Sequence, residues 1–257
     1  FIRFPTKTKP IHFVSKKNLM YITTSQSGVL VLDKKTREVR TYSFDPLDPL
    51  SISSSRFSSK QTKPIAIDGE TMWLGTTNGL NKINLKTQTA KRYYSERTGF
   101  IENDTINAVQ KVKDGLLIGT SKGVVLYNDK TNTSKKITNN KTNNIEKINK
   151  DEHFLILGNK KTKLLDSELK TLYEISHKEP KTKITQLMED QFLIWSPGLK
   201  ETLLLSTKQN NKIKVKVSHG SLNDTPQDIL VDNQSNVWVA SNKGVYVAAN
   251  INKPAKF

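Results

Sequence analysis

The chain of 257 residues contains no cysteine, which excludes disulfide bonds, thiolate metal sites and cysteine nucleophiles. This absence is compatible with an oxidising compartment such as the periplasm, where stray thiols are a liability. No long apolar run occurs, so we expect no membrane insertion by this segment. Because the sequence opens inside a strand-like stretch, we expect it to be a piece of a longer protein.

Helical periodicity and catalytic motifs are also missing. No window shows a sustained apolar period of about 3.6 residues, so no helix is predicted. The 4 histidines show no metal-binding spacing, and the Gly-x-Ser-x-Gly motif of serine hydrolases does not occur. We therefore expect no enzyme, no metal and no cofactor.

The chain has few acidic residues relative to its basic residues. Lys and Arg number 41 against 24 Asp and Glu, which gives a net charge of +17. Such an excess suits an anionic partner, for example an acidic polysaccharide, a membrane surface or a nucleic acid. However, only six of the cations are Arg, the side chain that specific phosphate and base recognition prefers. The lysines are scattered, as in the alternating stretch Lys212, Lys214 and Lys216, so we favour solvated surface lysines and do not favour nucleic acid.

The sequence does contain a repeat of about 43 residues. Residues 68–83, 114–127 and 232–247 share a polar turn, a stretch like Trp-Leu-Gly-Thr and a Gly-containing loop. Counting equivalents of Trp73 gives six copies, although the degeneracy of some copies leaves seven possible. The equivalent positions are Tyr21, Trp73, Leu117, Leu155, Leu193 and Trp238.

Each repeat unit carries short apolar runs separated by polar turns, which predicts four antiparallel β-strands. Such units are typical of β-propeller blades, and a solenoid of β-arches is the alternative. We predict an all-β propeller of four-stranded antiparallel blades in a single domain, residues 1–257. The sixth copy stops after its third strand, residues 244–248, and residues 1–4 resemble a fourth strand. We expect this N-terminal strand to close the propeller by completing the last blade.

The run Trp73-Leu74-Gly75-Thr76-Thr77-Asn78-Gly79-Leu80, which follows Asp68-Gly69, resembles the two-component regulator propeller repeat. The Asp-Pro-containing loop at residues 43–53 is similar to a segment that this family places between blades. The resemblance covers residues 19–127 well and returns at residues 237–247. It implies the periplasmic sensor region of a hybrid two-component system of the Bacteroidetes type. The six copies counted here depart from the seven blades usual in that family.

In a propeller, the loops between second and third strands share a face with the connections between blades. We call this face the loop face, and we expect ligand-binding residues there because loops on a rigid scaffold commonly carry function. Trp73 and Trp238 are expected in the core between blades, whereas Trp195 is a candidate aromatic contact for a ligand. The full set of candidates is Arg56, Arg97, Glu102, Asn103, Asp104, Lys122, His177, Trp195, His219 and Lys243.

These observations favour a non-enzymatic, extracytoplasmic sensor or ligand-binding module of the periplasm or cell envelope. Its expected ligand is an oligo- or polysaccharide, acidic if the positive charge is functional. A second copy of the chain and additional domains of the same protein are further candidate partners. A protein–protein scaffold of the envelope or of a secretion system is the first alternative. The second is a propeller lyase, which would use His177 and His219 at the central mouth.

Overall fold

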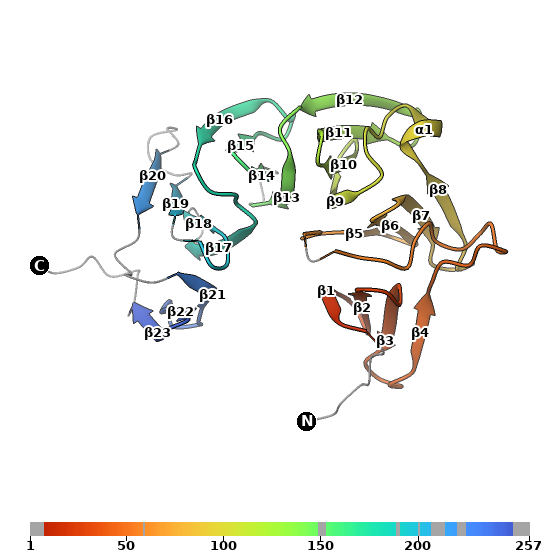
Figure 1. The fold of residues 1–257 in the computed structure, drawn as a ribbon, viewed down its shortest axis with the longest axis horizontal. Coiled ribbons are helices and arrows are strands. Elements are labelled where there is room, and N and C mark those ends of the chain that lie inside the picture. Colours follow the sequence, from red (N-terminus) through yellow and green to blue (C-terminus); the bar gives the residue numbers. More distant parts are fainter. Residues whose placement is uncertain are drawn as a thin grey trace, which may run out of the picture. The chain divides into compact units, whose positions relative to one another are not determined.

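The fold is built almost entirely from β-strands, as the computed structural model shows (Figure 1). The structure describes residues 8–58, 60–148, 153–188, 191–199, 201–206, 214–219 and 225–248. Within these ranges the strands form five antiparallel sheets of four strands and one of three. The expected absence of helix is wrong in one place, where α1 (Ser95–Thr98) makes a single turn. No helix in the described ranges is long and apolar enough to cross a membrane.

Strands follow one another in chain order within every sheet, each pairing with the next by a hairpin (Figure 1). The first three sheets comprise β1 (Pro10–Lys16), β2 (Leu19–Thr24), β3 (Val29–Asp33) and β4 (Val39–Tyr42); β5 (Ile65–Asp68), β6 (Thr71–Thr76), β7 (Gly79–Asn84) and β8 (Ala90–Tyr93); and β9 (Ile106–Val112), β10 (Gly115–Thr120), β11 (Gly123–Asn128) and β12 (Thr133–Thr138).

The remaining sheets repeat this order. They comprise β13 (Thr142–Lys147), β14 (Phe154–Gly158), β15 (Lys161–Leu165) and β16 (Thr171–Ser176); β17 (Lys183–Met188), β18 (Gln191–Trp195), β19 (Glu201–Ser206) and β20 (Lys214–His219); and β21 (Pro226–Val231), β22 (Val237–Ser241) and β23 (Gly244–Ala248).

The repeated position lies in the second strand of every sheet. It falls in β2, β6, β10, β14, β18 and β22, so the six sheets correspond one to one with the six sequence copies. The predicted four-stranded unit and the count of six are therefore confirmed for the described residues. The predicted closing strand, residues 1–4, lies outside them.

A recurring polar turn connects the third and fourth strands. In the first sheet the Asp33 carboxylate accepts the backbone N–H groups of Lys35 and Thr36, at 2.8 and 3.1 Å. These hydrogen bonds lower the pKa of Asp33. Asn84 and Asn128 accept the corresponding pairs of N–H groups in the next two sheets. A short polar side chain is required here because it replaces the strand ladder as the partner of the turn amides.

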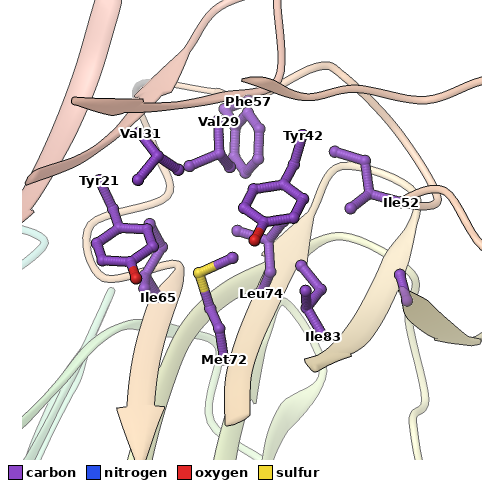
Figure 2. Packing of buried hydrophobic residues seen from close by; sticks show 11 residues of the cluster. Tyr21, Val29, Val31, Tyr42, Ile52, Phe57, Ile65, Met72, Leu74 and Ile83 are labelled. Atoms are coloured by element: carbon purple, nitrogen blue, oxygen red, sulfur yellow. The ribbon is translucent and has the colours of Figure 1, made fainter. Parts of the chain in front are cut away.

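The core is distributed between neighbouring sheets. In the first cluster, side chains of the first sheet face side chains of the second (Figure 2). Tyr21 and Tyr42 flank Met72, which is fully buried. The other labelled members are Val29, Val31, Ile52, Phe57, Ile65, Leu74 and Ile83.

The opposite face of the second sheet packs on the third through an aromatic cluster. Trp73 is 5% exposed, which confirms the prediction that it lies in the core. Its ring centroid is 5.8 Å from that of Tyr93 and 6.1 Å from that of Tyr127, and Phe100 stacks on Tyr127 at 4.0 Å. Alternating strand residues thus serve two different clusters, because successive side chains point to opposite faces of a sheet.

The chain forms two compact units, residues 1–145 and 146–257. The first unit contains the first three complete sheets. In the second, one cluster includes Leu155, Leu164 and Phe192, and another combines Trp195 with Ile229 and Val237.

The expectation for Trp238 is wrong. Its side chain is 40% exposed, and its indole N–H donates to the Asp232 carboxylate at 2.8 Å. Val237 and Val239 on either side of it belong to the cluster around Trp195, so strand alternation directs Trp238 to the opposite face.

Candidate functional site

Three loops of the first unit interlock on the loop face. Thr77, in the β6–β7 loop, donates through its N–H and its hydroxyl to the carbonyl of Arg56, at 3.4 and 3.2 Å. The N–H of Gly79 donates to the carbonyl of Asp104 at 2.6 Å, and the hydroxyl of Thr105 donates to the carbonyl of Thr77 at 3.2 Å. The predicted sharing of one face by these loops and connections is therefore confirmed in this part of the molecule.

A cavity of about 790 Å³ opens beside these loops, and we call it the loop-face pocket. Its size lies in the range of small-molecule sites. It brings together two predicted site residues, Arg97 and Asp104. The complete lining is Pro49, Leu50, Asn78, Ala90, Lys91, Arg92, Tyr94, Glu96, Arg97 and Asp104.

The turn α1 positions one wall of the pocket. The carbonyl of Tyr94 accepts the N–H groups of Arg97 and Thr98, at 3.2 and 3.1 Å, while the Asp104 carboxylate accepts the N–H of Ser95 at 2.6 Å. The Arg97 guanidinium lies 5.8 Å from the centre of the Tyr94 ring, within the range of a cation–π contact. Arg97 and Glu96 are exposed and can therefore reach a ligand.

Arg92 shapes the opposite wall, and the sequence prediction missed it. Its guanidinium donates to the carbonyl oxygens of Ser51 and Asp48, at 2.7 and 2.6 Å, and to the Ser51 hydroxyl at 2.6 Å. It also lies 5.3 Å from the centre of the Phe44 ring. These contacts fix the Asp-Pro loop that carries Pro49 and Leu50. The available signal was that a proline-containing loop lacks backbone donors and needs a side chain to satisfy its carbonyl groups.

The other predicted residues of the first unit do not line this pocket. Asn103 accepts the N–H of Thr105 at 2.9 Å and so stabilises its own loop. The Glu102 carboxylate pairs with Lys136 of β12, at 2.6 Å for one oxygen. Arg56 is exposed and contributes its backbone carbonyl to the loop network. Lys122 is exposed in the β10–β11 loop.

In the second unit, the predictions for His177 and Trp195 are wrong because both side chains are buried. His177 is 7% exposed, and its Nε2 lies 3.0 Å from the Thr162 hydroxyl. Trp195 is 1% exposed, and its indole N–H donates to the Thr185 hydroxyl at 2.9 Å. Neither can contact a ligand from solvent without local opening.

The last two candidates also lie in the second unit. His219 was expected in a loop, but it is the final residue of strand β20. Only the backbone of this residue is described. Lys243 is exposed in the β22–β23 loop, and its N–H donates to the Ser241 hydroxyl at 3.1 Å. Of the ten predicted ligand-binding residues, the structure therefore brings Arg97 and Asp104 together in the loop-face pocket.

Metal-binding clusters are not found in the described ranges, where no three His, Asp or Glu side chains converge. Tyr93 and Tyr127 have raised pKa values, chiefly because burial disfavours the charged form. Both tyrosines belong to the aromatic cluster between the second and third sheets, so these shifts reflect core packing.

Comparison with known proteins gives matches in structure alone. No protein-family model matches the chain, and no curated protein matches it. The extracellular domain of BT3049, described as a hybrid two-component system of B. thetaiotaomicron, gives a TM-score of 0.73 at 18% identity, over 96% of this chain and 34% of that one. The extracellular domain of BT4673 from B. thetaiotaomicron gives 0.65 at 17%, over 93% and 32%. The WD40 domain of Toxoplasma gondii coronin gives 0.57 at 9%, over 90% and 65%.

These matches establish the fold. WD40 domains are β-propellers, and the six antiparallel sheets of this chain are propeller blades. The two B. thetaiotaomicron domains are of the kind that the sequence resemblance predicted. The chain spans about a third of the length of those two extracellular domains.

Proposed function

We propose that this chain is an extracytoplasmic sensor module of a two-component system and that it binds its ligand in the loop-face pocket. The observation that carries the proposal is the interlocking of three loops around one cavity that holds Arg97, Asp104 and Asn78. A preformed pocket on a rigid scaffold is the arrangement expected of a binding site. The similarity to extracellular domains of two-component systems supports the same role.

The pocket chemistry favours an oligosaccharide ligand. Sugar hydroxyls both donate and accept hydrogen bonds. The Asn78 amide does both, the carboxylates of Glu96 and Asp104 accept, and the cations Lys91 and Arg97 donate. Tyr94 adds an aromatic surface with a polar edge. The two cations would also accommodate a uronic acid.

The proposal includes no catalytic step. The ten lining residues contain no His, Ser or Cys, so the pocket lacks the nucleophile–base pair of acyl-transfer enzymes, and of its two carboxylates Asp104 already accepts the N–H of Ser95. Binding without turnover is the behaviour required of a sensor that reports ligand concentration.

The test is calorimetric titration with a panel of neutral and uronic-acid oligosaccharides. We expect Arg97→Ala and Asn78→Ala each to weaken the binding of a recognised sugar about tenfold, the loss of one or two ligand hydrogen bonds. Lys35→Ala, at the exposed β3–β4 turn, is the matched control and should leave affinity unchanged. Steady product release from any recognised sugar would overturn the non-enzymatic assignment, and equal affinities of all three variants and the wild type would overturn the site.

A protein scaffold is the second candidate function, and one observation favours it. The Asp-Pro loop exposes Leu47 to 91%, Leu50 to 53% and Phe44 to 42%. Asp45 and Asp48 accept the N–H groups of Leu47 and Leu50 at 2.8 and 2.9 Å, so this apolar tip is held in place. If the loop binds a protein, Leu47→Asp should abolish capture of that protein from envelope extract and leave oligosaccharide titrations unaffected.

A further inference from the structure

A second cavity, of about 470 Å³, lies between the second and third sheets at the strand ends away from the loop face. The β5–β6, β9–β10 and β11–β12 turns surround it, and we call it the turn-face cavity. Strand direction alternates within a sheet, so these turns lie opposite the β6–β7 and β10–β11 loops. Its lining is Asp68, Thr71, Trp73, Lys82, Lys111, Lys113, Asp114, Gly115, Leu116, Tyr127, Asn128, Asp129 and Lys130.

Two ion pairs cross from one sheet to the other at the rim. The Lys82 ammonium of β7 pairs with Asp129 in the β11–β12 turn. Lys111 of β9 lies 3.6 Å from the carboxylate of Asp68, the last residue of β5. Each pair neutralises one cation of the rim and links the two walls of the cavity.

The remaining charged groups are available to a ligand. Lys113 and Lys130 are exposed, and neither forms an ion pair within the described part of the chain. Asp114 is the third exposed charge of the rim without an ion pair there. The lining as a whole holds four lysines against three aspartates, so the cavity carries an excess of positive charge.

The base of the cavity is aromatic. Trp73 is 5% exposed and is fixed by Tyr93 and Tyr127 through ring contacts. The indole N–H groups of Trp195 and Trp238 donate to Thr185 and Asp232, respectively. In contrast, the indole N–H of Trp73 donates to no acceptor among the described residues. This N–H is not among the fully buried polar groups that lack a partner, so it is accessible from the cavity that Trp73 lines and can donate to an acceptor placed there.

We propose that the turn-face cavity binds a small organic anion, a carboxylate- or phosphate-bearing molecule about the size of one sugar ring. Two unpaired ammonium groups and one indole N–H offer donors to an oxyanion, and charge-assisted hydrogen bonds of this kind are the strong ones. The Lys82 ammonium lies 5.7 Å from the centre of the Trp73 ring, and Tyr127 completes the aromatic part of the lining, on which the apolar face of a ring can pack. Its volume of about 470 Å³, against about 790 Å³ for the loop-face pocket, suits a ligand of one ring and distinguishes the two sites. The inference does not depend on the proposed sensor function.

The test uses the whole protein labelled with 5-fluorotryptophan and followed by ¹⁹F NMR. The three Trp signals are assigned with single Trp→Phe variants, and the probes are glucuronate, inorganic phosphate and glucose. We expect saturable shifts of the Trp73 signal with glucuronate, with phosphate or with both. A shift with glucuronate alone indicates a carboxylate ligand, and a shift with phosphate alone indicates a phosphate-bearing ligand. The buried Trp195 signal should stay constant, and glucose should produce no shift.

Two double variants make the test specific. Lys113→Gln with Lys130→Gln should weaken anion binding at least tenfold. Lys17→Gln with Lys86→Gln removes the same charge from hairpin turns of the first and second sheets that do not line the cavity, and it should leave the affinity unchanged. Tyr94→Ala in the loop-face pocket should also leave it unchanged.

The proposal is overturned by an unshifted Trp73 signal at millimolar anion, by equal binding of glucose and glucuronate, or by equal losses in the two double variants. The last result would indicate diffuse attraction to a basic protein. Thermal unfolding of each variant separates loss of binding from loss of folding.

Discussion

At the scale of single residues, the glycines of the second-to-third-strand loops show how closely the backbone approaches itself. Gly123 has φ +134°, and a Cβ built on it would lie 2.0 Å from the carbonyl oxygen of Thr138. Gly28 has the same kind of contact with Tyr42. Gly69 also has a positive φ, +55°, but a Cβ there would meet nothing within 4 Å. The two kinds of glycine therefore differ in what a side chain would disturb.

Gly123→Ala should be much more destabilising than Gly69→Ala. The first change adds a backbone clash to an unfavourable φ, and we expect a loss of about 3 kcal/mol or more in the free energy of unfolding. The second adds only the left-handed penalty of about 1 kcal/mol. Urea denaturation of both variants measures the difference, and equal losses would show that the close approach at Gly123 relaxes without cost.

Asp232 provides a pH-dependent contribution to stability. Hydrogen bonds from Trp238 and from the side chain and backbone of Asn236 hold its pKa at about 2, below the usual value. Since the native pKa is depressed, the contribution is present above the unfolded pKa, near about 4, and is lost as pH falls through the native value. Asp232→Ala should therefore lower the melting temperature at about pH 5 and have little effect at about pH 2. An equal effect at both values would contradict this assignment.

Residue-level prediction from sequence succeeded where the repeat defined the environment. The repeat period placed Trp73 in the second strand of its unit. Its burial follows because the second sheet packs against the first sheet on one face and the third sheet on the other. The burial of His177 and Trp195 could not be predicted in this way, because it depends on Thr162, Thr185 and Ile229, which pack against them from elsewhere in the unit. The exposure of Trp238 likewise depends on which face of its sheet is covered.

At the scale of elements, the Asp-Pro loop is held by one side chain from a neighbouring sheet. Arg92 of β8 donates to carbonyl groups that the loop cannot satisfy internally. A planar guanidinium reaches several acceptors in fixed directions, which an ammonium group cannot do. The shape of the loop-face pocket therefore depends on this arginine.

Arg92→Lys should loosen the loop without unfolding the sheet. We expect a loss of about 1–2 kcal/mol in the free energy of unfolding, corresponding to one or two hydrogen bonds. Amides of residues 45–51 should show faster hydrogen exchange. Arg40→Lys, on the exposed strand β4, is the control and should change neither quantity. Unchanged exchange in Arg92→Lys would mean that the turns of the loop suffice to hold it.

Hairpins and polar turns were predictable because each is encoded within a few consecutive residues. The cavities were not, because their walls join positions far apart in the chain. Lys82 meets Asp129 and Lys111 meets Asp68 across two sheets, and no local pattern specifies either pair. The residues that surround the second cavity lie in hairpin turns on the side away from the loop face, where the propeller repeat predicts no binding residues.

At the scale of the whole molecule, the net charge of +17 can attract polyanions from any direction. Besides Arg92, which is bound to the Asp-Pro loop, the cations that line the loop-face pocket are Lys91 and Arg97, and they differ from exposed cations elsewhere, such as Arg56 and Lys122. The alternating lysines of residues 212–216 lie partly outside the described residues. A specific uronic-acid ligand would depend on the first group alone.

Polyuronate binding should weaken steeply between low and near-physiological salt, because each neutralised anion releases counterions. Lys91→Ala with Arg97→Ala should reduce affinity about tenfold or more, whereas Arg56→Ala with Lys122→Ala should change it less than about twofold. Titrations at two salt concentrations measure both effects. Equal losses in the two variants would show that the attraction is diffuse and that the lysine excess serves solvation.

Gln61 reinforces the packing of the second sheet on the third, which bears on the order in which the first unit is made. Its side-chain amide donates to the carbonyl of Gly75 in β6, at 3.2 Å, and to that of Ile106 in β9, at 2.7 Å. When a ribosome has released the second sheet but not the third, this amide lacks the Ile106 carbonyl and the apolar surface around Trp73 lacks the third sheet. Each newly synthesised sheet therefore covers the exposed apolar face of the sheet before it. Its own opposite apolar face stays exposed until the next sheet is made. The nascent chain carries one such face at a time, which limits the surface that a chaperone must shield during translation.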